Sequence, residues 1–307
     1  MSNDQSRDNI ISGKVALSMS SSASHSILAW AGGIAGAIEA IVVQPLELIK
    51  VRFQLNHGNN GSIISTAQEI IAEGGGARLY RGLIPELCGM FPTRSVMYSS
   101  NEMAKRMLLG DSSSGEKKEE TTPVVALSGA FSGVAEAVVV TPFQVVKVRL
   151  QAKEHLGRYT NSFDCIRKLF REEGLVVFSN GMPATIGRNS IFNAVFFTVM
   201  YKIKGVSPAP RDSKFKATIH SFVTGFIGGV MATMCNAPFD VIKSRIQAQC
   251  PNNVEYTSTI QALTKIGRTE GPAALYKGFQ PKALRMGIGG AVAVTAFEAV
   301  CELAHSL

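Results

Sequence analysis

Three copies of one ten-residue segment contain the side chains best placed for chemistry in this sequence. The copies read PLELIKVRFQ from Pro45, PFQVVKVRLQ from Pro142 and PFDVIKSRIQ from Pro238, so they recur about 97 residues apart (142 − 45 = 97; 238 − 142 = 96). Each copy has an acidic or amide side chain three residues before a lysine, at the end of an apolar stretch. Ionisable groups at membrane depth are costly and are usually paired or functional. The interval indicates three tandem units.

Three helices around a pseudo-threefold axis would bring these positions into one ring. The predicted ring consists of Glu47, Lys50, Gln144, Lys147, Asp240 and Lys243. Its side chains would reach neighbouring units, pairing Glu47 with Lys147, Asp240 with Lys50, and Gln144 with Lys243. We expect this ring to close one mouth of a central cavity and to be weakest at Gln144. In the alternative interpretation, these side chains simply extend to the membrane interface.

Two arginines in the later units are candidate ligands for an anion. Arg188 lies 13 residues before Tyr201, and Arg285 lies 13 residues before Glu298. On a helix that spacing is about 20 Å, which puts both arginines near the middle of a membrane. A guanidinium binds a carboxylate through two parallel hydrogen bonds. The spacing therefore predicts a carboxylate site at this depth.

The remaining candidates in this layer are less specific. Gly89 holds the matching place 13 residues before Glu102, where we expect it to widen the site, and Arg94 is a further candidate ligand. In the structural alternative, the arginines pair with a helix carboxylate. Glu39 and Glu136, each six residues before a repeat proline, are the candidates for that role.

Composition indicates a membrane protein. Of the 307 residues, 46% are hydrophobic and 18% charged, against roughly 25% charged in an average soluble protein. The net charge of +8 favours anionic ligands or anionic lipid. We expect no nucleic-acid binding, because the basic residues lie inside apolar repeats without interleaved aromatic residues.

The elements that position these residues follow one order in each unit. A long apolar helix runs through the proline, and a polar loop, a short amphipathic helix and a second long helix follow. In the first unit the helices are predicted at residues 26–56, with a kink at Pro45, then at 62–72 and 83–109. The other short helices are predicted at 162–172 and 257–269, and Gly74, Gly174 and Gly271 should end the three.

We therefore predict an all-α membrane protein with six transmembrane helices and three short surface helices. A polar tail is expected over residues 1–24, and the repeats over 25–115, 116–210 and 211–307. Polar stretches at residues 111–122 and 206–216 should link the units outside the membrane.

Neither a metal site nor a cofactor is expected. The five cysteines are scattered, odd in number and without a CxxC pair, and the five histidines lack HExxH spacing. We find no nucleophile and base pair and no phosphate-binding loop, so we expect no enzyme activity and no catalytic residue. The N-terminus lacks the apolar core of a secretory signal, and its Asp4 and Asp8 are unlike a transit peptide.

The repeats resemble the mitochondrial carrier family over about residues 26–304. Its signature, Pro-x-[Asp/Glu]-x-x-[Lys/Arg] on each odd helix, is met by all three copies except at Gln144. The resemblance implies a pseudo-threefold bundle of six tilted helices, one central substrate site and exchange by alternating access. It also implies a monomer in the mitochondrial inner membrane, with cardiolipin or other lipid at the ends of the surface helices. The positive-inside rule puts the basic helix ends toward the matrix and both termini toward the intermembrane space.

The resemblance implies two further sets of residues. The family's even helices carry an outer, cytoplasmic ring, and the matching positions here are Glu102, Lys105, Tyr201, Lys204, Glu298 and Cys301. Two pairs remain in that ring, Glu102 with Lys204 and Glu298 with Lys105. The second set, Gln54, Gln151 and Gln247, matches the glutamine brace that lies under the inner ion pairs in this family.

Several segments resemble the 2-oxodicarboxylate carriers of the family, among them GMPATIGRNSIFNAVFF and LYKGFQPKALRMGIGGAV. Arg188 followed by Asn189 also resembles the contact pair of carboxylate carriers. These likenesses imply exchange of 2-oxodicarboxylates such as 2-oxoadipate and 2-oxoglutarate. The second long helix departs from the pattern, since Pro92-Thr93-Arg94 and Met97 give it less positive charge. Citrate, cis-aconitate or another dicarboxylate as substrate, and a non-transporting membrane scaffold, remain alternatives.

Overall fold

The computed structural model describes residues 34–56, 62–109, 121–207, 214–249 and 254–306, and these residues include no strand. The long helices in this part of the chain are the helix at residues 34–55, α3 (Leu83–Leu109), α4 (Thr122–Gln151), α6 (Met182–Val206), α7 (Lys214–Ala248) and α9 (Phe279–Ser306). The short helices are α2 (Ile63–Gly74), α5 (Ser162–Glu173) and α8 (Thr259–Thr269). This is the predicted order of elements in all three units.

The chain divides into two compact units. One comprises Val43–Ile288, and the other comprises Met1–Val42 with Gly289–Leu307. The larger unit contains α2 to α8, the part of the first helix that includes Pro45, and the first residues of α9. All side-chain contacts reported below lie within this larger unit.

Within the larger unit, α4 packs against α3 and α6, and α6 packs against α7. Small residues allow the closest of these contacts. A Cβ atom on Gly133 would lie 2.4 Å from the backbone nitrogen of Ser190, and one on Gly129 would lie 2.8 Å from the carbonyl oxygen of Asn193. Any side chain at either glycine would therefore force α4 and α6 apart, as expected for helices that pack through small residues.

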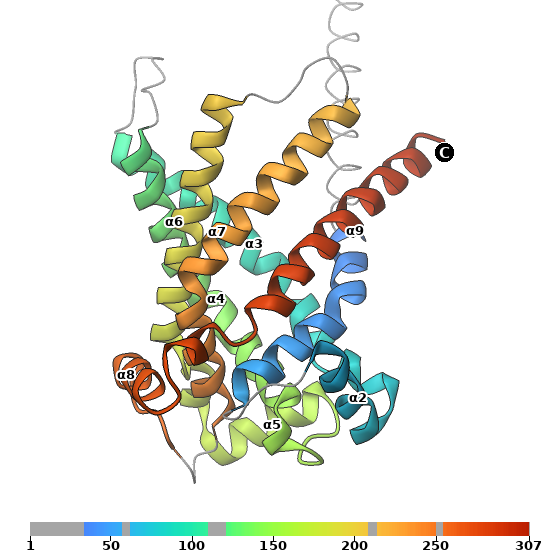
Figure 1. Ribbon diagram of the computed structural model, residues 1–307, viewed down its shortest axis with the longest axis vertical. Coiled ribbons are helices and arrows are strands. Elements are labelled where there is room, and N and C mark those ends of the chain that lie inside the picture. Colours follow the sequence, from blue (N-terminus) through green and yellow to red (C-terminus); the bar gives the residue numbers. More distant parts are fainter. Residues whose placement is uncertain (1–33, 57–61, 110–120, 208–213, 250–253, 307) are drawn as a thin grey trace, which may run out of the picture. The chain divides into compact units, whose positions relative to one another are not determined.

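The three short helices lie at one end of the larger unit (Figure 1). Each begins with a side-chain cap, because the oxygens of Ser62, Asn161 and Ser258 accept hydrogen bonds from backbone N–H groups three residues later. A glycine with positive φ follows each short helix: Gly75, Gly174 and Gly271. The predicted stop at Gly74 is wrong by one residue, since α2 includes Gly74 and the positive φ falls on Gly75.

Short 3-10 helices connect the short helices to the next long helix. They are η1 (Gly76–Tyr80), η3 (Leu175–Ser179) and η4 (Pro272–Tyr276), and a further one, η2 (Lys153–His155), follows α4. The first helix, α4 and α7 continue through Pro45, Pro142 and Pro238. Residues 26–33 and most of both predicted linkers lie outside the described residues.

Two helices of the described part are long and apolar enough by composition to cross a membrane, at Thr122–Gln151 and Ile219–Ala248. Six such helices are predicted from the sequence. One predicted helix that does not meet the criterion is α3, because it contains five charged residues: Glu86, Arg94, Glu102, Lys105 and Arg106. These groups lower its mean hydropathy, although α3 is as long as predicted.

Candidate functional site

Two of the three predicted ion pairs are present at the proline ends of the helices. Nζ of Lys147 lies 3.1 Å from Oε1 of Glu47, and Nζ of Lys50 lies 3.2 Å from Oδ2 of Asp240. Each of these side chains is at most 10% exposed. The pairs join the first helix to α4 on one side and to α7 on the other. The predicted pairing between units is therefore confirmed at these positions.

The third predicted pair is absent. Among the described residues, no hydrogen bond or ion pair involves Lys243, and Oε1 of Gln144 is buried without a hydrogen-bond partner. Lys243 is nevertheless buried, with only 7% of its surface exposed. A neutral amide lacks the Coulomb attraction that draws a carboxylate and an ammonium together across several ångströms. The irregular residue predicted to weaken the ring therefore leaves Lys243 without the partner that Lys50 and Lys147 have.

Both candidate arginines contact the carboxylates of the ring. Nη1 of Arg188 lies 3.6 Å from Oδ1 of Asp240, and Nε of Arg285 lies 3.2 Å from Oε2 of Glu47. The sequence spacing predicts the arginines in a separate layer, nearer the middle of the helices. Their long side chains instead extend toward the proline ends, so the arginines and the ring form one charged cluster.

Lys282 is the first member of this cluster that was not predicted from the sequence. Its Nζ lies 2.8 Å from Oδ2 of Asp240 and 3.2 Å from Oδ1 of Asn236. The same ammonium is 5.9 Å from the centre of the Phe192 ring. Asp240 thus receives three cations, from Lys50, Arg188 and Lys282.

Glu86 is the second missed member. It forms an ion pair with Lys147, and its Oε1 lies 3.4 Å from Nη2 of Arg285. Glu86 lies three residues before Gly89, and Lys282 lies three residues before Arg285. A comparison of the three repeats could therefore have identified both residues, because each lies one helical turn from a position already singled out.

The other predicted substrate contacts lie in different surroundings. Asn189 is buried and accepts a hydrogen bond from Arg188, while its Nδ2 has no partner. Gly89 packs on α4, since a Cβ atom there would lie 3.0 Å from the Phe143 ring. This contact gives the glycine a role in close helix packing, and its role in widening the site stays a prediction. Arg94 is exposed, and no hydrogen bond or ion pair to another described residue is present.

The alternative pairing with Glu136 is not observed. Oε2 of Glu136 accepts a hydrogen bond from Nδ2 of Asn193 at 2.9 Å, and that amide also lies 3.3 Å from Oγ of Ser132. Within the larger unit, the arginines have Glu47, Glu86 and Asp240 as counter-ions instead. Glu39 belongs to the smaller unit.

The outer ring lacks its first predicted pair. Glu102 bonds Arg106, four residues later on its own helix, at 3.3 Å. Both side chains are more than half exposed, and Lys204 is exposed without an ion pair to a described residue. The side chain of Glu298, predicted to pair with Lys105, lies outside the described part. The described contacts are thus those of a molecule closed at its proline ends.

The three predicted brace glutamines lie at boundaries between units. A Cβ atom added to the glycine before each even helix would meet a glutamine side chain, with the pairs Gly82–Gln151, Gly181–Gln247 and Gly278–Gln54. Each glutamine contacts the preceding repeat, and Gln54 of the first repeat contacts the third, so the contacts form a closed cycle. Gln54 accepts a hydrogen bond from Ser244 at 2.7 Å, and Gln151 donates one to the carbonyl of Arg81 at 3.1 Å. No hydrogen bond joins a brace glutamine to the described ion pairs of the ring.

A second threefold set ties the short helices to the long ones, and it was also missed. An arginine seven residues after each repeat proline bonds a glutamate at the end of the short helix: Arg52–Glu73, Arg149–Glu173 and Arg245–Glu270. Burial opposes ionisation of Glu270, but hydrogen bonds from Arg245 and Lys277 outweigh it and lower the pKa of Glu270 to about 2. The recurrence of arginine and of Glu-Gly at fixed positions was the available signal.

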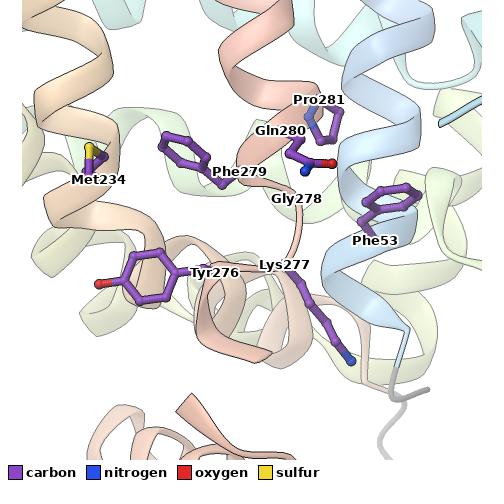
Figure 2. A pocket seen from close by; sticks show the side chains of 8 residues that line it. All are labelled: Phe53, Met234, Tyr276, Lys277, Gly278, Phe279, Gln280 and Pro281. Carbon is purple, nitrogen blue, oxygen red and sulfur yellow. The ribbon is translucent and has the colours of Figure 1, made fainter. Parts of the chain in front are cut away.

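A groove of about 470 Å³ opens at the start of α9, and none of its lining residues belongs to the charged cluster. Figure 2 shows its lining: Phe53, Met234, Tyr276, Lys277, Gly278, Phe279, Gln280 and Pro281. The cation of Lys277 is held by Glu270 at 3.1 Å and by the carbonyl of Asn56 at 3.0 Å. The groove therefore adds apolar surface near the predicted lipid sites and contains none of the predicted site residues.

Comparison with known proteins accounts for the threefold pattern. A family model described as mitochondrial carrier protein matches residues 21–112, 118–208 and 215–306. This chain belongs to the mitochondrial carrier family. Its all-α architecture of three repeats, each with two long helices and a short one, is the carrier fold.

Several named carriers align with most of this carrier's length. A probable mitochondrial 2-oxodicarboxylate carrier of Dictyostelium discoideum is 38% identical over 272 residues, which cover 89% of each chain. The mitochondrial 2-oxodicarboxylate carrier of Mus musculus is 35% identical, over 87% of this chain and 91% of its own. Mitochondrial citrate transporter D of Aspergillus niger is 32% identical, over 90% and 93%.

Proposed function

We propose that this carrier exchanges 2-oxodicarboxylates, such as 2-oxoglutarate and 2-oxoadipate, or related di- and tricarboxylates across the mitochondrial inner membrane. The observation that carries this proposal is the pairing of Arg188 and Arg285 with the ring carboxylates Asp240 and Glu47. Each arginine is held by a carboxylate that a soluble acid can replace. The names of the related carriers support the same class of substrate.

Replacement of these partners couples binding to opening. A substrate carboxylate that binds Arg188 competes with Asp240, which also holds Lys50 across the ring at 3.2 Å. A second carboxylate on Arg285 competes with Glu47, which holds Lys147 at 3.1 Å. Binding energy thereby offsets the loss of the ion pairs that close the proline ends, as alternating access at one site requires.

The outer-ring pair that is not formed, Glu102 with Lys204, fits one end state of this cycle. Glu102 and Lys204 are apart while the inner pairs are formed, so the substrate enters from the side opposite the prolines. We place that side toward the intermembrane space, with both termini on it, and the short helices toward the matrix. The carrier acts as a monomer and as a transporter, with no reaction on its substrate. Lipid, including cardiolipin, binds near the ends of the short helices, where the groove of Figure 2 offers apolar surface.

Citrate or cis-aconitate is the second candidate substrate class, favoured by the citrate transporter among the relatives and by the cations around Asp240. The test is exchange in liposomes loaded with unlabelled malate or 2-oxoglutarate. We expect uptake of labelled 2-oxoglutarate or of another acid in a panel of keto, di- and tricarboxylates. Liposomes without internal acid provide the control. No uptake of any acid in the panel would contradict transport and leave the scaffold alternative.

A further inference from the structure

Lys243 is a buried cation that the two ion pairs of the ring do not neutralise. It is 7% exposed, and no hydrogen bond or ion pair to it is present among the described residues. The residue at the acidic position of the neighbouring unit is Gln144, whose Oε1 is also buried without a partner. Burying an ammonium without a counter-ion is strongly unfavourable. Such a group is a strong attractor for an anion.

The nearby carboxylate is already shared among other cations. Asp240 lies three residues before Lys243 on α7, so the two side chains share a helix face. Asp240 is bonded by Lys282 at 2.8 Å and by Lys50 at 3.2 Å, and lies 3.6 Å from Arg188. The single negative charge of Asp240 is thus already shared by three cations other than Lys243.

The surroundings of Lys243 are otherwise positive. Arg188, Lys50 and Lys147 all repel it, and the repulsion from Arg188 is foremost, ahead of the attraction from Asp240. Two cations held close in a buried site repel each other unless an anion lies between them. Since Arg188 is already a candidate substrate ligand, an acid bound there would also meet Lys243.

From this arrangement we infer that Lys243 is a third cationic contact for the transported acid, beside Arg188 and Arg285, and that the preferred substrate is a tricarboxylate. The inference rests on the proposed function and narrows its substrate class. Arg188 and Arg285 take two carboxylates, and the third carboxylate takes Lys243. The glutamine at position 144 makes this possible, because an acidic side chain there would form an ion pair with Lys243.

The test compares tricarboxylate with dicarboxylate exchange in liposomes. For the wild type we expect a higher kcat/KM for citrate than for 2-oxoglutarate. In Lys243→Gln, the KM for citrate should rise by about tenfold or more, as expected for loss of one charge-assisted contact, while that for 2-oxoglutarate changes by less than about threefold. Lys265→Gln, at a half-buried lysine on α8 paired with Glu255, is the matched control and should change neither value.

A second variant keeps the lysine. Gln144→Glu supplies Lys243 with a protein carboxylate, so it should raise the KM for citrate selectively as Lys243→Gln does. Binding is measured separately, by the rise in the melting temperature of the purified protein on adding citrate, which should shrink in both variants. The inference is overturned by a wild type that prefers 2-oxoglutarate, or by variants in which both KM values change equally or not at all. A wild type that moves no acid instead contradicts the proposed function.

Discussion

At the scale of single residues, the site consists of cations that share too few carboxylates. Arg188 and Arg285 contact the same acids that close the ring, Asp240 and Glu47. This sharing gives each arginine two roles, one in holding the substrate and one in sensing whether the ring is closed. The consequences of removing an arginine and of adding a carboxylate follow directly.

Replacing either arginine with alanine should abolish exchange. Arg188→Ala and Arg285→Ala each remove a two-pronged contact worth about 1.5–3 kcal/mol per hydrogen bond to a charged group. We expect at least a hundredfold loss of exchange in liposomes, with the melting temperature still measurable in detergent. Arg94→Ala, at the exposed candidate, should retain most activity. A wild-type rate in Arg188→Ala or Arg285→Ala would remove that residue from the site.

Adding the missing acid should stabilise the closed ring. Gln144→Glu places a carboxylate near Lys243, which is already buried and lacks an ion pair among the described residues, so only the new carboxylate has to be desolvated. The melting temperature of the substrate-free protein should rise by a few degrees, corresponding to about 1 kcal/mol or more. Gln144→Met, which fills similar space without charge, is the control. An unchanged or lower value in Gln144→Glu would argue against any reach between positions 144 and 243.

At the scale of elements, the short helices are held by buried arginine–glutamate pairs, and their caps and glycines set only where they begin and end. Arg149 is fully buried, and its Nη2 lies 2.9 Å from Oε2 of Glu173. In the third unit, Arg245 also bonds the carbonyl of Gln54 at 3.0 Å. The same guanidinium thus anchors α8 and the end of the first helix. Loss of this anchor should appear as a change in stability.

The ion pair between Arg245 and Glu270 predicts how the stability of the folded protein depends on pH. Its pKa is about 2 in the folded protein, below the ordinary value of 4.5. The stabilisation is therefore complete above pH 4.5 and is lost as the pH falls toward 2. Glu270→Gln should lower the melting temperature near neutral pH and lessen its decrease between about pH 4.5 and 2. Identical slopes for wild type and variant in that range would refute the assignment.

At the scale of the whole molecule, the two rings differ in state within the larger unit. The inner ring has two buried ion pairs, whereas Glu102 and Lys204 of the outer ring are exposed and Glu102 bonds its own helix. The brace glutamines add a closed cycle of contacts between units at the same end as the inner ring. The inner end should therefore hold most of the stability of this conformation.

Charge removal in the two rings should separate these contributions. Glu47→Gln leaves Lys147 and Arg285 short of a counter-ion in a buried site, a loss of about 3–5 kcal/mol for such a pair. Glu102→Gln breaks an exposed pair worth about 0–1 kcal/mol. Thermal unfolding in detergent should show a decrease of many degrees for Glu47→Gln and little change for Glu102→Gln. Equal decreases would mean that the outer ring also contributes to this conformation.

The sequence alone determined the threefold repeat, the order of the helices and two of the ring ion pairs, because these follow from local pattern and from positions that recur at a fixed interval. It also singled out Gln144 as the irregular member. The tertiary structure was needed to show that Arg188 and Arg285 share their counter-ions with the ring, that Glu86 and Lys282 join them, and that no described acid forms an ion pair with Lys243. Those facts depend on how far long side chains reach across helices. Sequence spacing fixes the height of a residue on its helix, but not the carboxylate that its side chain meets.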